Sequence, residues 1–226
     1  MEEGLRERKK RQTRERIADL AMGLFMARGF DGVTVAEVAR AADVSVNTVF
    51  NYFRTKEDLF MDRWEEVEDL PSRVVRERAA GESVLAAFRR DFLDALDTRH
   101  WRYGLNEGAD VFAGMVRASP SLMARMRVLE RATVERLART LAEDTGAGPG
   151  DLAPRLVAAQ IMDAVRLLSE RTIWRPVEGE SWAEIAADVR GLVQAAFGLL
   201  EKGIGGYAVR QEDRPAATSA SIRKPP

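Results

Sequence analysis

The sequence predicts an all-α fold, and three observations lead to this class. Apolar residues recur almost throughout with the spacing of amphipathic helices, and strand-like alternation is nearly missing. Several Ser or Thr residues are followed three positions later by Glu or Asp, a pattern that marks helix starts. The 226 residues, 46% of them hydrophobic, suffice for one large helical domain or two smaller ones.

The first two helices are predicted over about residues 8–28 and from Thr34 to about Ala41. The first has an apolar stripe formed by Ile17, Leu20, Ala21, Leu24 and Phe25. Gly29 then ends it. Thr34 and the glutamate three residues later form a capping box that begins the second helix.

Two more helix starts follow closely. Ser45 is placed to cap a third helix that runs to about Phe53, and Thr55 caps a fourth. We expect the fourth helix to run toward Asp69 and to break or kink at Pro71, which has no N–H to donate.

The remaining chain predicts five longer helices and a tail. They are expected over about 83–97, 105–116, 120–144, 152–171 and 182–203. From residue 203 the chain is rich in Gly, Ala, Ser and Pro, so residues 203–226 are expected to be a disordered tail.

Charge is distributed unevenly along the chain. The net charge is -1, but residues 1–56 hold eleven basic against eight acidic side chains, a net of +3, so the rest is acidic. The cations are densest in residues 5–16, an arm before the first helix. Such a run suits an anionic partner, although a merely solvated helix start is an equal alternative on this segment alone.

Composition excludes several classes of function. The chain has no cysteine and one histidine, so a disulfide framework, a thiolate metal site and a zinc site are excluded, and we expect neither metal nor cofactor. We find no nucleophile motif, Gly-rich phosphate loop or carboxylate pair, and expect no enzyme activity. The apolar stretch over 191–200 is too short to span a membrane, so no membrane partner and a cytoplasmic location are expected.

The second and third helices, joined by a three-residue turn, predict a helix-turn-helix. If Val49 and Phe53 point inward, the outer side of the third helix is uncharged and consists of Val46, Asn47, Thr48, Phe50, Asn51 and Tyr52. Such side chains can hydrogen-bond base edges or phosphates and pack on thymine methyl groups. The alternative is that Phe50 and Tyr52 belong to the core.

Residues 13–60 resemble the DNA-binding region of the tetracycline-repressor (TetR) family of bacterial transcriptional regulators. The motifs that carry the resemblance are Arg28-Gly29-Phe30-Asp31-Gly32-Val33-Thr34-Val35, Val38-Ala39, Ala42-Asp43-Val44-Ser45, Thr48-Val49-Phe50-Asn51-Tyr52-Phe53 and Thr55-Lys56-Glu57-Asp58-Leu59-Phe60. The resemblance implies a DNA-binding helix-turn-helix domain over 1–56, a larger helical effector-binding and dimerisation domain over 57–202, and an operator in double-stranded DNA.

The resemblance also implies roles for single residues. Phosphate contacts are expected for Thr34, Lys56 and Tyr52. We expect contacts with bases or with the DNA backbone for Ser45, Val46, Asn47, Thr48 and Asn51. The chain departs from the family at three positions. Asp43 replaces a usual Gly in a turn where a left-handed conformation is expected, Asn47 replaces a small residue and Phe50 replaces a usual Tyr.

The last predicted helix carries two apolar stripes, and only one of them can face the core of its own chain. One stripe is Ile185, Val189, Leu192, Ala196 and Leu199, and the other is Trp182, Ala186, Val193, Phe197 and Leu200. We expect the second to need a partner, which fits the family's homodimer through the last two helices. A monomer with a deep core is the alternative.

A site for an unknown small-molecule effector is expected among the central helices, with an apolar lining and few polar anchors. Its candidate residues are Trp64, Phe88, Phe92, Phe112, Met126, Gln160 and Asp163. Ordinary core packing is the alternative for the apolar residues. For Asp163 the alternative is a salt bridge with Arg166 or a dimer contact.

The sequence thus predicts a dimeric, ligand-responsive transcriptional repressor that a small apolar effector releases from a palindromic operator. Within the same class, an activator or a ligand-independent regulator is the alternative. Two alternatives belong to other classes of protein. One is a helical small-molecule-binding protein without specific DNA binding, and the other is a non-specific architectural DNA protein.

Overall fold

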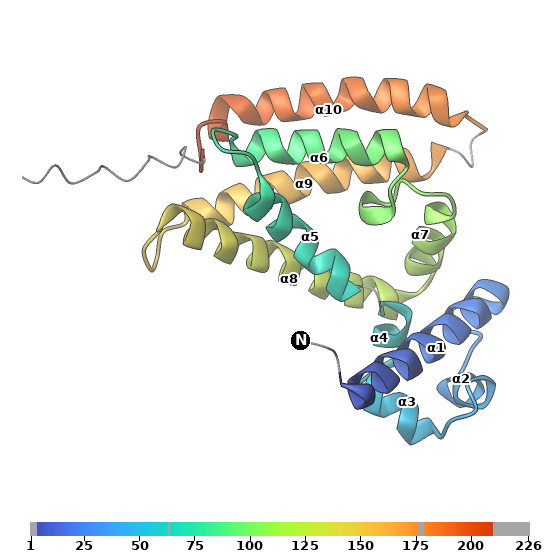
Figure 1. The fold of residues 1–226 in the computed structure, drawn as a ribbon. Coiled ribbons are helices and arrows are strands. Elements are labelled where there is room, and N and C mark those ends of the chain that lie inside the picture. The colour runs from blue at the N-terminus through green and yellow to red at the C-terminus, as the bar shows by residue number, and fades with distance from the viewer. Residues whose placement is uncertain (1–3, 63, 176–178, 210–226) are drawn as a thin grey trace, which may run out of the picture.

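The structure is a computed structural model that describes residues 4–62, 64–175 and 179–209. Within these residues the chain forms ten α-helices, one short 3-10 helix and no strand, which confirms the all-α class (Figure 1). The elements are α1 (Leu5–Arg28), α2 (Val35–Ala41), α3 (Val46–Tyr52), α4 (Lys56–Phe60), α5 (Trp64–Glu77), α6 (Val84–Thr98), η1 (Trp101–Tyr103), α7 (Ala109–Ala118), α8 (Pro120–Thr145), α9 (Ala153–Ile173) and α10 (Trp182–Ile204).

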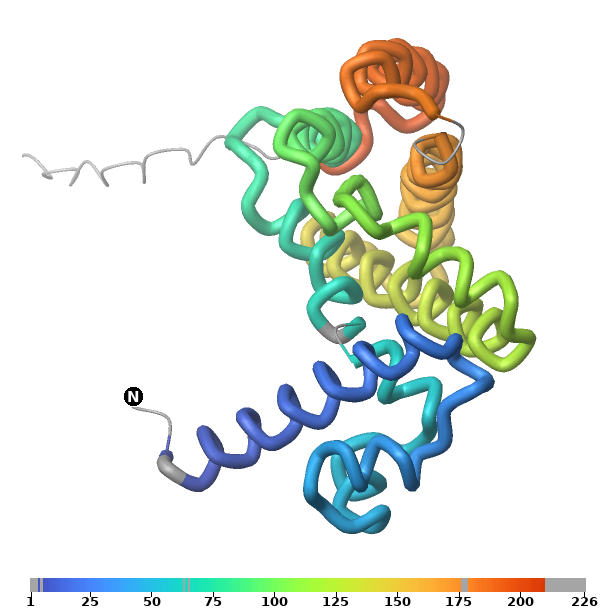
Figure 2. The backbone as a smooth tube through the Cα atoms, turned by 90° about the vertical axis from the view of Figure 1, so that its right-hand side faces the viewer, coloured from blue at the N-terminus to red at the C-terminus, as the bar shows by residue number. Residues whose placement is uncertain are grey.

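Helices α1–α4 form a small N-terminal head. Its core includes the rings of Phe25, Phe30 and Phe60, whose centroids lie 5.2 to 5.7 Å apart. The same core also takes in Val116 of α7 and Leu122 of α8. The head therefore packs directly on the rest of the molecule, and Figure 2 shows α1 meeting the α7–α8 end of it.

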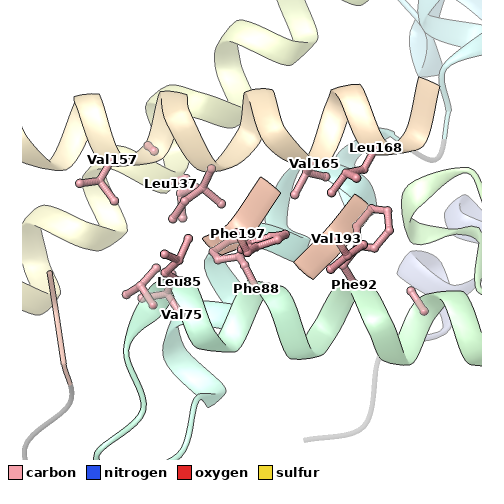
Figure 3. Packing of buried hydrophobic residues seen from close by; sticks show 14 of the residues in the cluster. Val75, Leu85, Phe88, Phe92, Leu137, Val157, Val165, Leu168, Val193 and Phe197 are labelled. Atoms are coloured by element: carbon pink, nitrogen blue, oxygen red, sulfur yellow. The ribbon is translucent and has the colours of Figure 1, made fainter. Parts of the chain in front are cut away.

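The larger body is built from α5, α6, α8, α9 and α10 around a second core. Phe88 and Phe92 of α6 are fully buried in it and lie between α6 and α9 (Figure 3). Leu85 and Leu96 lie on the same side of α6 and are buried as well. The helix predicted from Ser83 is thus confirmed, with the Ser83 hydroxyl accepting from the N–H of Ala86.

The predicted fourth helix is two helices in the structure, and Pro71 does not break it. Helix α4 ends at Phe60, and α5 then begins at Trp64 and continues through Pro71. Because proline has no backbone N–H, the helix lacks one hydrogen bond at this position. Because Pro71 is buried and α5 packs along α8, tertiary contacts stabilise the helix in spite of this loss.

Two further expectations are corrected at the chain ends. Helix α1 begins at Leu5, three residues before its predicted start, so the basic residues from Arg6 to Arg16 all lie within the helix and none of them forms an arm before it. At the other end, α10 continues to Ile204, and Tyr207 and Ala208 pack against the body core, where a disordered tail was expected. The remainder of that predicted tail, residues 210–226, lies outside the described residues.

A buried arginine fixes this C-terminal turn. Arg78, at 2% exposure, pairs with the Asp144 carboxylate, Nη1 to Oδ1 at 3.0 Å. Its Nη2 also donates to the backbone oxygen of Ala208 at 3.1 Å. One guanidinium therefore joins the ends of α5 and α8 to the residues after α10.

Candidate nucleic-acid interface

Helix α3 is fixed in place by the cap at its N-terminus and by two buried side chains. The Ser45 hydroxyl accepts from the Thr48 N–H at 3.0 Å, and the two hydroxyls hydrogen-bond each other at 2.8 Å. Val49 and Phe53 are buried at 1% and 2% exposure, which confirms the predicted inward side. The rest of the helix therefore faces outward from a fixed base, and Figure 1 places it at the end of the molecule opposite α10.

The turn before α3 has the backbone conformation that the sequence predicts. Asp43 has φ 52°, in the left-handed region that Asp tolerates better than most residues. The N–H of Val44 donates to the Ala39 carbonyl at 2.9 Å, which closes the turn. Asp43 thus adopts the backbone conformation that a glycine would usually supply in the turn between α2 and α3.

The outer side of α3 carries two neighbouring ridges. Val46 and Phe50 form an apolar ridge with 38% and 47% exposure, so Phe50 does not belong to the core. Asn47 and Asn51 form an exposed amide ridge beside it. No residue that the structure describes hydrogen-bonds these two amides, so their donors and acceptors are available to a ligand.

Tyr52 is half-buried and lies where α3 approaches α1. A surface groove of about 360 Å³ runs between the two helices, lined by Glu7, Lys10, Arg11, Arg14, Asn51 and Tyr52. Arg14 Nε donates to Asp62 Oδ1 at 2.8 Å, and its guanidinium lies 5.2 Å from the centre of the Phe53 ring. The basic side of α1 is therefore adjacent to the C-terminal end of α3.

Thr34 is engaged in the predicted capping box. Its backbone N–H and its hydroxyl both donate to Glu37 Oε2 at 2.8 Å. The Thr34 backbone hydrogen bond, with help from the Thr34 hydroxyl and Arg28, lowers the pKa of Glu37 to about 2. This fixes the start of α2, and a phosphate contact by the Thr34 hydroxyl requires its proton to be exchanged from Glu37 to the phosphate.

Lys56 is the first residue of α4. Its ammonium lies 4.2 Å from the centre of the Phe30 ring and 5.9 Å from that of Phe25. The aromatic faces attract the cation and restrict where it can point. Lys56 is therefore a positioned charge at a helix start of the head.

The structure does not bring the seven predicted effector residues together. Phe88 and Phe92 are fully buried in the body core. Trp64, Phe112 and Met126 instead surround the core of the head and are only partly buried. Of these, Trp64 has a buried indole N–H without a hydrogen-bond partner among the described residues.

Gln160 and Asp163 lie away from both cores, on the exposed side of α9, so neither faces an interior pocket. The opposite side of this helix is the buried one, with Val157, Ile161, Val165 and Leu168. Asp163 Oδ1 accepts a hydrogen bond from Arg166 Nη2 at 3.0 Å. This is the salt bridge with Arg166 that the sequence indicates as an alternative to effector binding.

The buried stripe of α10 differs from both predicted stripes. It consists of Ile185, Val189, Val193 and Phe197, two from each predicted set. Leu199, expected on the first stripe, is 73% exposed. The apolar arc of this helix is wide, so several stripes can be drawn through it and only packing selects one.

Contacts between head and body were not predicted. The rings of Phe60 and Phe112 stack at 4.8 Å, and Arg125 of α8 pairs with Asp58 of α4 at 2.7 Å. The partners in each pair are far apart in sequence and no local pattern connects them. These contacts tie α4 to α7 and α8.

Residues 100–103 comprise the short helix η1 and its cap His100, and they pack on α6. Tyr103 stacks on Phe92 at 4.9 Å and donates to Asp91 Oδ2 at 2.5 Å. Burial, followed by the nearby Asp91 charge, raises the pKa of Tyr103. Arg102 pairs with Asp94 at 2.6 Å, so these residues close the end of α6.

Two absences apply to the part of the chain that the structure describes. No three His, Asp or Glu side chains there are grouped as ligands of a metal ion. None of its helices combines the length and the apolar character needed to cross a bilayer.

Together, the fold and the exposed α3 define an all-helical protein with an N-terminal helix-turn-helix. The family model for bacterial regulatory proteins of the tetR family matches residues 17–62. The HTH-type transcriptional regulator TcmR of Streptomyces glaucescens is 30% identical over 172 residues, which cover 74% of this chain and 75% of TcmR. The chain belongs to the TetR family of bacterial transcriptional regulators.

Two further comparisons agree with this assignment. The HTH-type transcriptional regulator AcrR of Shigella flexneri is 37% identical over 54 residues, which cover 24% of this chain and 25% of AcrR. GusR of Salmonella enterica has the same fold, with a TM-score of 0.50, 16% identity, and 83% of this chain and 96% of GusR covered. The sequence similarity to AcrR covers a short part of the chain, whereas the likeness to GusR is one of fold and extends over most of the chain.

Proposed function

We propose that this protein is a homodimeric transcriptional repressor that binds a pseudo-palindromic operator and is released from it by a small apolar effector. The observation that carries the proposal is the outward, uncharged side of α3, fixed by Val49 and Phe53 and bordered by the basic side of α1. A rigid helix with free amides and apolar side chains suits the major groove, and the cations beside it suit the phosphates.

Two copies are part of the mechanism. Because α3 has no charge, one head gains little affinity from it, and two heads on one duplex multiply the effect. Exposed leucines on the last two helices support a dimer through α9 and α10: Leu156 is 57%, Leu167 56% and Leu199 73% exposed. Large apolar side chains gathered on one side of a protein favour an interface.

DNA binding is assigned to residues 1–56, and effector binding and dimerisation to residues 57–202. Leu59 and Phe60 of the second segment complete the core of the head, so the two parts act through a shared interior. The head's DNA contacts are proposed for Thr34, Ser45, Val46, Asn47, Thr48, Phe50, Asn51, Tyr52 and Lys56. If α1 and Lys56 neutralise about four phosphates per protomer, the dimer's plot of log K against log[salt] has a slope near -7, at about -0.9 per contact.

The effector is proposed to bind at the partly buried apolar residues around the head core. Trp64, Phe112 and Met126 pack there, and the Trp64 indole N–H is available as one polar anchor. Since α7 and α8 share that core with the head, a molecule that separates them also moves α3. The effector must bind one arrangement of the heads more tightly than the other for release to follow.

The proposal is tested by selecting bound duplexes from a random-sequence DNA library with the full-length protein. We expect one enriched sequence made of two inverted half-sites. Enrichment of no sequence, with affinity for random DNA alone, would support the architectural alternative and overturn the proposal.

Three alanine variants then separate the roles of single residues. Tyr52→Ala and Lys56→Ala remove proposed phosphate contacts, so they should weaken binding to selected and random duplexes alike. Asn47→Ala should cost roughly 1 to 3 kcal/mol on the selected duplex only. Fluorescence anisotropy titrations at fixed salt measure all three. Equal losses from Asn47→Ala on both duplexes would contradict a base-reading role.

A further inference from the structure

The two ridges of α3 differ in chemistry, and this difference bears on which bases the helix reads. One ridge is apolar, Val46 and Phe50, and the other is made of the Asn47 and Asn51 amides. The two members of each ridge are four residues apart, so each ridge runs along the helix axis and would follow the floor of a groove.

We propose that Val46 and Phe50 read thymine methyl groups while Asn47 and Asn51 read the adenines of the same short stretch, so that the half-site under α3 consists of A·T pairs. This rests on the proposed function and specifies its DNA substrate. In the major groove, thymine presents its C5-methyl and adenine presents the N6–N7 pair that an amide matches with two hydrogen bonds.

The apolar ridge is suited to a methyl group and to little else in a groove. Phe50 has no hydroxyl to offer a phosphate, and almost half of its side chain is exposed. Val46, one helical turn earlier, is exposed at 38%. Covering both with thymine methyl groups removes apolar surface from water on each partner.

The amide ridge is equally specific in what it can offer. Asn47 and Asn51 are exposed, and no described residue engages their amides. By contrast, the hydroxyls of Ser45 and Thr48 are joined to each other at 2.8 Å. Apart from the Tyr52 hydroxyl, which is proposed to contact a phosphate, the amides are the polar groups of the outer side that no described residue engages, and adenine is the base that they recognise best.

The distribution of cations argues against guanine as the main target. Guanine is read most often by Arg or Lys, and α3 contains neither. Cations instead lie on both sides of the helix. Arg40 lines a groove of about 470 Å³ that also contains Val46, and Lys10 and Arg11 line the groove at Tyr52. Phosphate strands border the major groove in the same way, so these cations suit the backbone.

The test replaces thymine with deoxyuracil, which removes only the methyl group, one position at a time in the selected palindrome. Each symmetric replacement is made in both half-sites, and anisotropy titrations of the full-length protein measure Kd. One methyl lost from an apolar contact is worth about fourfold in Kd, hence roughly fifteenfold for two half-sites. We expect at least one position with a loss of this size.

Substitutions in the apolar ridge test which residue causes that loss of affinity. At the position that Phe50 contacts, Phe50→Ala should bind the thymine duplex more weakly and no longer distinguish it from the uracil duplex, while Phe50→Leu should distinguish them again. Val46→Ala should have the same effect at the position that Val46 contacts. Val128→Ala, at a 57% exposed valine of α8 outside the head, is the matched control and should behave like the wild type. Circular dichroism melting curves check that every variant is folded.

The outcomes separate this inference from the function on which it rests. If no palindrome is selected, the proposed function fails and this inference with it. If a palindrome is selected but uracil has no effect at any position, or neither Phe50→Ala nor Val46→Ala reduces the sensitivity at any position, only the methyl-reading role fails. A selected half-site without A·T pairs would overturn the inference outright.

Discussion

At the scale of single residues, the turn before α3 shows how one backbone conformation positions a whole surface. Asp43 adopts φ 52°, and the hydrogen bond from Val44 to Ala39 depends on that turn. The left-handed conformation was predictable because the TetR family usually has Gly at this position, and Asp is one of the few other residues that tolerate positive φ.

Substitutions at Asp43 should report the cost of this conformation. Asp43→Ala is expected to lower the free energy of unfolding by about 1 kcal/mol, because Ala is strained at positive φ, whereas Asp43→Gly should not lower it. Urea unfolding followed by circular dichroism measures both. Asn47→Ala, at an exposed helical position, is the control that should leave the midpoint unchanged. An Asp43→Ala midpoint equal to the wild type would contradict the argument.

Side-chain exposure was predictable for some residues and not for others. The inward positions of Val49 and Phe53 follow from helical spacing within α3. The difference between Phe50, which is exposed, and Phe88, which is buried, does not follow from residue type, because both are equally apolar. Only the packing of other helices around each ring decides it.

At the scale of elements, capping residues place helix starts accurately, and tertiary packing overrides weaker indications. Thr34, Ser45 and Thr55 each cap a helix where the sequence predicts it. Pro71, in contrast, lies inside α5. A cap is a local hydrogen bond that the sequence contains in full, whereas the cost of a proline can be offset by contacts with a helix that is distant in sequence.

The capping box of α2 should give stability a measurable acid dependence. The pKa of Glu37 is lowered from 4.5 to about 2, so its ionised form stabilises the fold above about pH 4.5, and this contribution disappears as pH falls toward about 2. Glu37→Gln keeps a capping side chain without the charge. Its urea midpoint should lie below the wild type at neutral pH and approach it in acid.

The measurement is a series of urea unfolding curves at falling pH for both proteins. A difference between wild type and Glu37→Gln that stays constant down to about pH 2 would show that the carboxylate is not the group responsible.

At the scale of the whole molecule, α9 and α10 expose three large apolar side chains, Leu156, Leu167 and Leu199. Their exposed leucines led to the dimer proposed above. Helical periodicity identified α10 as having too much apolar surface for one core. It could not say which of its residues would remain outside, since that depends on how α6 and α9 pack against it.

Introducing charge on this surface should separate the two copies. The double variant Leu156→Glu with Leu199→Glu is expected to sediment as a monomer where the wild type sediments as a dimer, because burying carboxylates in an apolar interface is costly. Its affinity for the full palindrome should fall about 100-fold or more, to that of a half-site. Val128→Glu is the matched control, at an equally exposed position on α8. A double variant that remains dimeric would place the interface elsewhere.

The core shared by head and body sets a condition on how this regulator could be recombined with others. Val116, Leu122 and Leu129 complete the interior of the head although they belong to α7 and α8. A chimera that transplanted only the first 56 residues would leave Phe60 behind together with these three side chains, and Phe25 would lose the surface that it packs against. Changing the operator preference by exchanging modules therefore requires those three side chains to travel with the helix-turn-helix, whereas rewriting the outer ridges of α3 leaves the interior untouched.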